Sequence, residues 1–456
     1  MSFASINPAT DETLATISAW QEKDIESNLQ KVSAAHTGWV KTSFTQRAKY
    51  VRNAASILRK NKSQLSQLIS QEMGKLLKEA EAEVEKSALG LEFYADHAEA
   101  FLTPHSIKSD ASNSYVAFQP LGTVLAIMPW NFPFWQVFRF AAPALMAGNT
   151  AILKHASNVP QCALAIENCF IEAGVPENVF RTFMIRASQV ADVIADSRVH
   201  AVTLTGSTPA GQSVAAQAGK YLKKSVLELG GSDPFVVLED ADLETAVTNA
   251  VASRYLNCGQ SCIAAKRFIV VDKIADQFLE KFVTVVEALT PGDPLDEKTS
   301  LAPMARGDLR DELHQQVENA LAQGARAVTG CKPIDGPGAF YSASIIDHLE
   351  PNNSAYYEEL FGPVATIFRV KDEAEALRTA NDTPFGLGGS VWTQDAKRGE
   401  QFALQLQCGS AFVNGMVKSD PRLPFGGIKT SGYGRELAQE GIKEFVNTKT
   451  IWIKEA

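Results

Sequence analysis

The sequence lacks the long apolar runs and the basic tracts that are typical of membrane-spanning and nucleic-acid-binding chains. Its longest apolar stretch, residues 121–130, is too short to cross a bilayer and contains Pro129 near its end. No cluster of lysine and arginine is interleaved with aromatic residues, and the net charge is -9. Because nucleic-acid-binding surfaces need concentrated positive charge, we expect no nucleic-acid partner, and we expect no membrane association.

Cysteine is scarce and scattered. The six cysteines form no disulfide framework, and no pair of them has metal-ligand spacing with histidines nearby. They are Cys162, Cys169, Cys258, Cys262, Cys331 and Cys408. No secretory signal is evident either. We therefore expect free thiols, a cytoplasmic location and no bound metal.

What is present indicates a large α/β protein. With 456 residues, 45% of them apolar and 21% charged, the chain is too long for one core and should form two or three domains. Buried strands are predicted near 121–128, 150–154, 179–184, 201–205, 234–238, 268–271 and 364–370, and helices near 45–75, 79–98, 137–146 and 308–323. Strands that alternate with helices predict parallel sheets covered by helices, and we interpret the two long amphipathic helices, 45–75 and 79–98, as scaffold.

A candidate nucleophile lies in a turn of small residues. Cys262 follows Gly259-Gln260-Ser261 and precedes the apolar run 268–271. A thiol reacts as thiolate, so a reactive cysteine needs an environment that lowers its pKa. Taken alone, Cys262 is also compatible with a buried structural thiol.

Three further motifs accompany this turn. They are Pro129-Trp130-Asn131-Phe132-Pro133, Leu227-Glu228-Leu229-Gly230-Gly231 and Glu358-Glu359-Leu360-Phe361-Gly362-Pro363-Val364. In this order and at these separations, the four motifs resemble the aldehyde dehydrogenase superfamily, most closely the succinate-semialdehyde dehydrogenases. The resemblance implies an α/β aldehyde dehydrogenase-like fold. Its expected parts are a Rossmann-like cofactor-binding domain (1–105 and 121–228), an α/β catalytic domain (229–430), and segments 106–120 and 431–456 that build a small β oligomerisation hairpin.

The resemblance also assigns the catalytic roles. Cys262 matches the nucleophile that forms a thiohemiacetal and then a thioester. Asn131 matches the side-chain donor to the oxyanion, although a turn residue would explain it equally well. Glu228 matches the base that activates water, and a solvated glutamate at a strand end is its alternative. Relatives that transfer the acyl group to coenzyme A usually lack this glutamate, so its presence favours release of a free acid.

A nicotinamide cofactor is implied by the same resemblance. The fingerprint GxGxxG is absent, but Gly206, Ser207 and Gly211 follow a predicted strand and match the family's shorter pyrophosphate loop. A plain turn between strand and helix is the alternative. The other expected cofactor-binding residues are Trp130, Lys154, Ser157, Leu229, Glu359 and Phe361. Many relatives have a glutamate at position 157, which would repel a 2′-phosphate, so Ser157 beside Lys154 favours NADP over NAD.

The end of the substrate that is remote from its aldehyde group is expected to contact Arg139, Trp135 and Ser419. Arg139 lies in an apolar stretch and matches the arginine that binds the distal carboxylate in succinate-semialdehyde dehydrogenases, while an internal carboxylate is its alternative partner. Some of those enzymes have a second arginine where this chain has Leu256. A broader specificity, for other semialdehydes or for medium-chain or aromatic aldehydes, therefore stays open.

Two rival functions and one regulatory feature remain. A cysteine hydrolase would need a histidine near Cys262, and none of the seven histidines falls in the four motifs. A catalytically silent relative would not need Cys262, Glu228 and Asn131 together. Ala264 replaces the cysteine that forms a redox pair in some relatives, and Cys258 could substitute for it. We expect a homodimer or homotetramer that oxidises a small aldehyde with NADP or NAD.

Overall fold

The first half of the chain builds a six-stranded sheet. The computed structural model describes residues 2–455. The strands are β5 (Thr123–Met128), β6 (Thr150–His155), β7 (Phe180–Thr182), β8 (Val199–Thr205), β9 (Lys224–Glu228) and β17 (Gly432–Tyr433), in the order β17-β9-β8-β5-β6-β7. All neighbours are parallel except β17, which pairs antiparallel with β9. The four strands predicted up to residue 205 are confirmed.

Helices cover both faces of this sheet because its strands are apolar on both sides. On β5, Val124 and Ala126 belong to one core and Leu125 to another. The first core lies under α2 (Phe44–Lys60), α3 (Lys62–Met73), α4 (Leu77–Phe101), α5 (Trp135–Met146) and α6 (Pro160–Glu172). The second lies under α1 (Glu22–Trp39), α7 (Val190–Ala195) and α8 (Thr208–Lys220). The helix predicted over 45–75 is thus two helices, separated by the non-helical Asn61 (φ -99°, ψ 13°).

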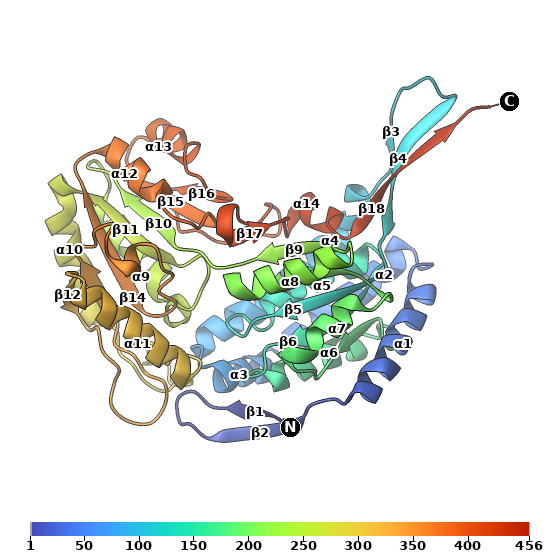
Figure 1. The fold of residues 1–456 in the computed structure, drawn as a ribbon, viewed down its shortest axis with the longest axis horizontal. Coiled ribbons are helices and arrows are strands. Elements are labelled where there is room, and N and C mark those ends of the chain that lie inside the picture. The colour runs from blue at the N-terminus through green and yellow to red at the C-terminus, as the bar shows by residue number, and fades with distance from the viewer. Residues whose placement is uncertain (1, 456) are drawn as a thin grey trace.

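The second lobe repeats the pattern with a seven-stranded sheet (Figure 1). Its strands are β10 (Asp233–Val237), β11 (Ala265–Val271), β12 (Arg326–Thr329), β13 (Ser344–Asp347), β14 (Val364–Val370), β15 (Gly388–Trp392) and β16 (Ser410–Val413), in the order β12-β13-β14-β11-β10-β15-β16. Its helices are α9 (Leu243–Tyr255), α10 (Asp272–Glu287), α11 (Gly307–Ala322), α12 (Glu373–Asn381) and α13 (Ala396–Ala403). All seven residues of β11 are buried, which makes this strand the centre of the lobe.

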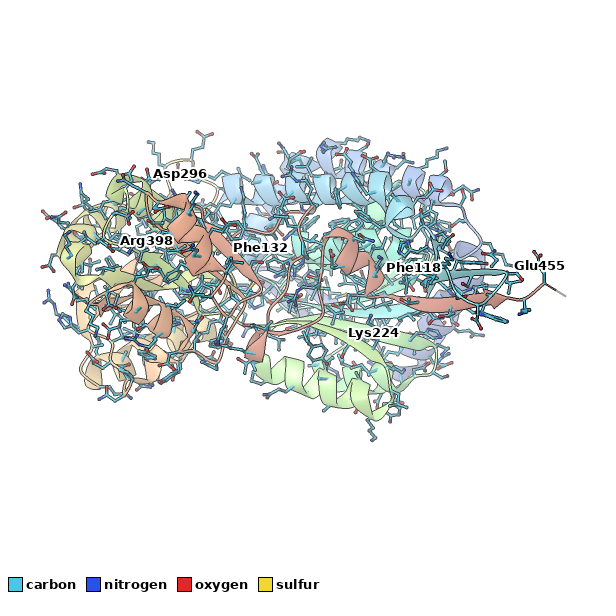
Figure 2. The ribbon with its side chains drawn as sticks, turned by 90° about the horizontal axis from the view of Figure 1, so that it is seen from above. Phe118, Phe132, Lys224, Asp296, Arg398 and Glu455 are labelled. Atoms are coloured by element: carbon cyan, nitrogen blue, oxygen red, sulfur yellow. The ribbon has the colours of Figure 1, made fainter. Side chains whose placement is uncertain are left out.

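A three-stranded arm projects from the first lobe and carries the C-terminal end of the chain (Figure 1). It contains β3 (His105–Ser106), β4 (Asn113–Pro120) and β18 (Val446–Ile453) in the order β18-β4-β3. Figure 2 shows Phe118 and Glu455 on this arm, and Phe132 near the middle of the molecule where the lobes meet. The short β17 lies within residues 431–456, which were expected to form an oligomerisation segment. It is instead the edge strand of the six-stranded sheet.

The remaining elements are short. A hairpin of β1 (Ser2–Ile6) and β2 (Thr13–Ser18) begins the described chain, and α14 (Ala438–Lys443) precedes the arm strand β18. The 3-10 turns are η1 (Ala187–Gln189), η2 (Leu256–Gly259), η3 (Ser354–Tyr356) and η4 (Lys429–Ser431). Within residues 2–455, none of the helices has the length and apolar character needed to cross a bilayer.

Candidate active site

A strained loop presents Cys262 to the space between the lobes. Helix α9 ends at Tyr255, and the next turn contains two non-glycine residues in the left-handed region, Asn257 and Cys258, each with φ 54°. Gly259 follows with φ 72°, and a Cβ there would lie 2.2 Å from the carbonyl oxygen of Gly362. Such backbone strain persists only where the surroundings hold it in place, and it commonly marks functional sites.

Arg254 holds this loop. Its buried guanidinium donates to the carbonyl oxygens of Gly259 (2.8 Å) and Ala265 (3.0 Å), on either side of Cys262. It also donates to the carbonyl of Gly362, within the fourth sequence motif. The sequence analysis did not identify this residue. A fully buried arginine surrounded by carbonyls positions the nucleophile and is not accessible to a substrate.

The Cys262 thiol is neutral in the ligand-free protein. Burial raises its pKa to about 12, and the charges of Glu359 and Glu228 add to that rise, while Arg139 and Lys266 oppose it. The side chain lines a cavity of about 420 Å³. Both lobes contribute to this cavity: Phe132 and Trp135 come from the first and Cys262 from the second.

Two hydrogen-bond donors belong to the loop of the thiol and to the segment that is hydrogen-bonded to this loop. The Asn131 side chain donates from Nδ2 to the carbonyl oxygen of Gln260 at 3.0 Å, and the Asn257 side chain donates to the carbonyl oxygen of Asn131 at 2.8 Å. An amide nitrogen carries two hydrogens, so Asn131 keeps one N–H for a ligand. Among the described residues the backbone N–H of Cys262 has no partner. These two N–H groups can hold an oxyanion that forms on a carbon bonded to the sulfur.

Glu228 occupies the end of β9 in a buried cluster of charges. Its carboxylate is 2% exposed, and neither oxygen has a hydrogen-bond partner among the described residues. Burial raises the pKa of Glu228 well above its ordinary value; the nearby carboxylate of Glu436 adds to the rise and Arg139 opposes it. Glu228 does not line the cavity itself, but its charge acts on the Cys262 thiol. Once it is ionised, a carboxylate with a raised pKa is a stronger base and is suited to accept a proton from water.

The expected phosphate loop leads into helix α8. Ser207 is the exposed residue before the first turn, and its side chain makes no capping bond, so the N-terminal N–H groups are not satisfied by it. A Cβ at Gly211 would come within 2.5 Å of Leu229, so glycine is required for this helix to pack against β9's end. Gly206 donates its N–H to the Glu228 carbonyl at 3.0 Å.

Lys154 and Ser157 lie at the carboxyl end of β6. Burial lowers the pKa of Lys154, and the lysine makes no ion pair within residues 2–455. Ser157 is exposed. An unpaired, partly buried lysine beside an exposed hydroxyl, together with the open end of α8, fits the phosphates of a dinucleotide.

The fourth motif contributes a second hollow, of about 470 Å³, lined by Glu359 and Phe361. Glu359 accepts a hydrogen bond from the Gly231 N–H at 3.1 Å and forms an ion pair with Lys266 at 3.2 Å. Phe361 contacts Trp130 edge to face, with ring centroids 5.9 Å apart. The motifs around Trp130, Gly231 and Glu359 are therefore brought together, as the sequence analysis expected.

Arg139, which lines the same cavity as Cys262, has an internal partner. Its Nε forms an ion pair with Glu436, and both side chains are buried. This is the alternative that the sequence analysis left open, although Arg139 also lines the cavity and its buried Nη2 has no hydrogen-bond partner among the described residues. Trp135 and Ser419 line the cavity too, with the indole N–H donating to the serine oxygen at 3.1 Å.

Lys86 also reaches this site and was not identified from the sequence. Its ammonium donates to Ser419 Oγ at 2.8 Å and lies 4.6 Å from the centre of the Trp135 ring. Lys86 belongs to α4, which was interpreted as scaffold. A signal was present in the sequence: charged residues recur on one stripe of the helix, at Glu79, Glu83 and Lys86.

Known proteins resemble the chain over its full length. The model of the aldehyde dehydrogenase family matches residues 1–451. A probable succinate-semialdehyde dehydrogenase [NADP(+)] of Synechocystis is 49% identical over 99% of this chain and 100% of its own. Succinate-semialdehyde dehydrogenase [NADP(+)] 1 of Mycobacterium ulcerans is also 49% identical, with the same coverage.

Solved structures agree with this result. The crystal structure of succinic semialdehyde dehydrogenase from Streptococcus pyogenes in complex with NADP+ superposes with a TM-score of 0.98 at 39% identity. It covers 99% of this chain and 100% of its own. The succinate-semialdehyde dehydrogenase of Burkholderia pseudomallei superposes with a TM-score of 0.97 at 32% identity, over 100% and 95% of the two chains. The match of the family model and these full-length similarities show that the chain belongs to the aldehyde dehydrogenase family.

Proposed function

We propose that the protein oxidises succinate semialdehyde to succinate with NADP as the preferred cofactor. The observation that carries the proposal is a cavity with the Cys262 thiol on its wall and cationic and hydroxyl groups elsewhere in it, at Arg139 and Ser419. A short aldehyde that ends in a carboxylate matches both features. The full-length relatives from Synechocystis and Mycobacterium ulcerans have names that specify this substrate and NADP.

The first half of the reaction uses the thiol and the two N–H donors. The Cys262 thiol releases its proton to solvent and its sulfur bonds to the aldehyde carbon, so the carbonyl oxygen takes the electron pair and becomes an oxyanion. Asn131 and the Cys262 N–H hold that oxyanion. Arg139 and Lys266 favour the thiolate electrostatically, which offsets part of the effect of burial on the thiol pKa.

The nicotinamide cofactor supplies the hydride acceptor that turns the thiohemiacetal on Cys262 into a thioester. Lys154, Ser157, Gly206, Ser207 and Gly211 would hold its adenosine and phosphate end. Leu229 and Trp130 would flank the bound cofactor, Glu359 would bind the nicotinamide ribose, and Phe361 would lie beside the nicotinamide ring. The unpaired Lys154 and the open N-terminus of α8 support this assignment.

Glu228 acts in the second half. Water must attack the thioester carbon, and a carboxylate that accepts the water proton makes the attack faster. The high pKa that burial gives Glu228 suits it to take that proton. The sulfur then leaves as thiolate and the acid is released.

A panel of aldehydes tests the function directly. Reduction of NADP and of NAD, followed by absorbance, should be fastest with succinate semialdehyde and slower with uncharged aldehydes of similar length. The apolar walls formed by Phe132, Trp135 and Phe425 favour the second candidate, a broader specificity for medium-chain or aromatic aldehydes. Equal kcat/KM for charged and uncharged aldehydes would support that candidate instead.

Cofactor choice should depend on position 157. Replacing Ser157 with glutamate is expected to shift the kcat/KM ratio from NADP toward NAD by about 10-fold or more, mainly through a higher KM for NADP. The reason is that a carboxylate would repel the 2′-phosphate and would accept hydrogen bonds from the free ribose hydroxyl. Steady-state kinetics with both cofactors measures the ratio.

The matched control is Ser157→Gln, which has the same length without the charge. It should weaken the NADP preference less than Ser157→Glu does. A wild-type protein that already prefers NAD, or a ratio that glutamate leaves unchanged, would contradict this role of Ser157.

We also propose that the arm mediates assembly into a homodimer or homotetramer in the cytoplasm. Strand β18 is an edge strand, so one side of its backbone is free to pair. Large apolar side chains on the arm are exposed, among them Ile107 (53%), Trp452 (49%) and Ile453 (40%). Light scattering should give two or four times the 49.4 kDa of one chain.

A further inference from the structure

We propose that Lys86 binds the distal carboxylate of the aldehyde and is the residue that selects an anionic substrate. This inference rests on the proposed function, because it names the group that recognises the far end of the substrate. It assigns a specificity role to helix α4, outside the four sequence motifs.

Lys86 is fixed at the cavity by two neighbours, Ser419 and Trp135. Its ammonium donates to Ser419 Oγ at 2.8 Å and lies over the Trp135 ring, 4.6 Å from the centroid. Gly90, one turn later on α4, leaves room for that ring, since a Cβ there would lie 3.0 Å from the Trp135 ring edge. All three of Lys86, Trp135 and Ser419 line the cavity that also contains Cys262.

The hydrogen bonds at Ser419 leave donors without an acceptor. Ser419 Oγ accepts from Lys86 and, at 3.1 Å, from the Trp135 indole N–H. A hydroxyl that accepts twice can still donate its own hydrogen, and an ammonium that donates once has two hydrogens left. No described residue accepts any of these three hydrogens. A ligand that satisfies them must bring acceptor oxygens, and a carboxylate provides two.

The charges around the cavity also indicate that Lys86 binds a carboxylate. The buried Lys75 forms an ion pair with Glu83, and Arg139 forms one with Glu436. Lys86 makes no ion pair with any described residue, and the nearby carboxylate of Asp420 is itself paired with Arg422 at 2.6 Å. Lys86 is therefore the partly buried cation of this cavity whose charge has no carboxylate partner.

The electrostatic environment of Lys86 favours an anionic ligand. Burial, Arg139 and Lys418 together lower the pKa of Lys86 to about 8, against the opposing effects of Glu83 and Asp420. Lys86 and Arg139 both line the cavity and their charges repel, and a carboxylate bound near both would reduce that repulsion. Binding of the anion then raises the pKa of Lys86, so the anionic aldehyde should bind best below about pH 8 and more weakly as the pH rises above it.

Substitution by methionine tests the inference, because methionine keeps most of the aliphatic stem and removes the charge. Lys86→Met is expected to raise KM for succinate semialdehyde about 10- to 100-fold, the range of one charge-assisted hydrogen bond, with little change in kcat. The KM for butanal, an uncharged aldehyde of similar length, should change by less than about threefold. Steady-state kinetics with both aldehydes at saturating NADP measures the two effects.

Two variants control for other causes. Lys86→Arg keeps the charge and should retain the preference for succinate semialdehyde, while its loss of affinity above about pH 8 disappears because arginine stays protonated. Lys60→Met removes an exposed lysine of α2 that does not line the cavity and should leave the ratio of the two KM values nearly unchanged. Thermal unfolding of each variant checks that the fold is intact.

The outcomes separate this inference from the proposed function. If the wild-type protein does not prefer succinate semialdehyde to butanal, the proposed function fails. If the wild type shows that preference and Lys86→Met keeps it, or loses both substrates equally, Lys86 does not select the carboxylate. A preference lost in Lys86→Met and kept in Lys86→Arg supports both.

Discussion

Replacing Cys262 with alanine is expected to lower aldehyde oxidation by about 10,000-fold or more, because no other group on the cavity wall can form the covalent thiohemiacetal. The fold should be unaffected, since the loop is held by Arg254 and by its left-handed turn and not by the thiol. Cofactor binding should therefore survive. Turnover is measured by absorbance of the reduced cofactor, and cofactor binding by fluorescence titration.

The matched control is Cys258→Ala, which removes the other thiol of the same loop. Cys258 is 1% exposed and burial raises its pKa, so it has neither the access nor the ionisation that a nucleophile needs. This variant should keep most of the activity. If Cys262→Ala retained more than a small part of wild-type turnover and Cys258→Ala did not, the nucleophile would be Cys258.

Replacing Glu228 with glutamine should separate the two halves of the reaction. We expect a rapid burst of reduced cofactor followed by steady turnover about 100- to 10,000-fold below wild type, the usual contribution of a general base. Glutamine matches the size and shape of glutamate, so the substitution removes the ionisable group of this buried side chain and keeps its volume. Stopped-flow absorbance measures the burst, and Glu440→Gln, on the exposed side of α14, is a charge-matched control.

The same substitution should change how stability depends on pH. The pKa of Glu228 is higher in the folded than in the unfolded protein, so the folded state binds more protons and wild-type stability falls as the pH rises above the unfolded value of about 4.3. Glu228→Gln lacks this contribution. Its melting temperature relative to wild type should therefore rise with pH over that range.

In the burst experiment, a Glu228→Gln variant that shows no burst of reduced cofactor would place Glu228 in the first half of the reaction, in which the thioester forms.

The sequence predicted those strands and motifs that can be recognised within one short stretch of the chain. The strands β5, β6, β7, β8, β10, β11 and β14 were predicted because each lies in an apolar run, whereas the parallel strands β9, β13, β15 and β16 were not predicted. The four motifs were recognised by their order and separations. The break at Asn61 was missed, since the apolar spacing continues across it from α2 into α3. Periodicity reports which face of a helix is buried, and it does not report a single residue that leaves helical φ and ψ.

Contacts between distant segments could not be predicted. Arg139 is a cation in an apolar stretch, which indicates an anionic partner, but only the fold shows that α5 lies beside the segment carrying Glu436. Lys86 was missed for a related reason. A charged stripe on an amphipathic helix usually faces solvent, and here the same stripe faces a cavity closed by Trp135 and Ser419.

Helix α4 separates the choice of substrate from the chemistry performed on it. Two adjacent rows of its residues line the cavity at spacings of three or four: Lys78, Ala82 and Lys86, and Glu79 and Glu83. Cys262 is held by a loop of the other lobe. Evolution can therefore exchange side chains along this stripe without disturbing the strained loop around Cys262. A duplicated gene could acquire a new aldehyde through a few changes on one regular helix, and a protein engineer could use the same positions to redirect the enzyme.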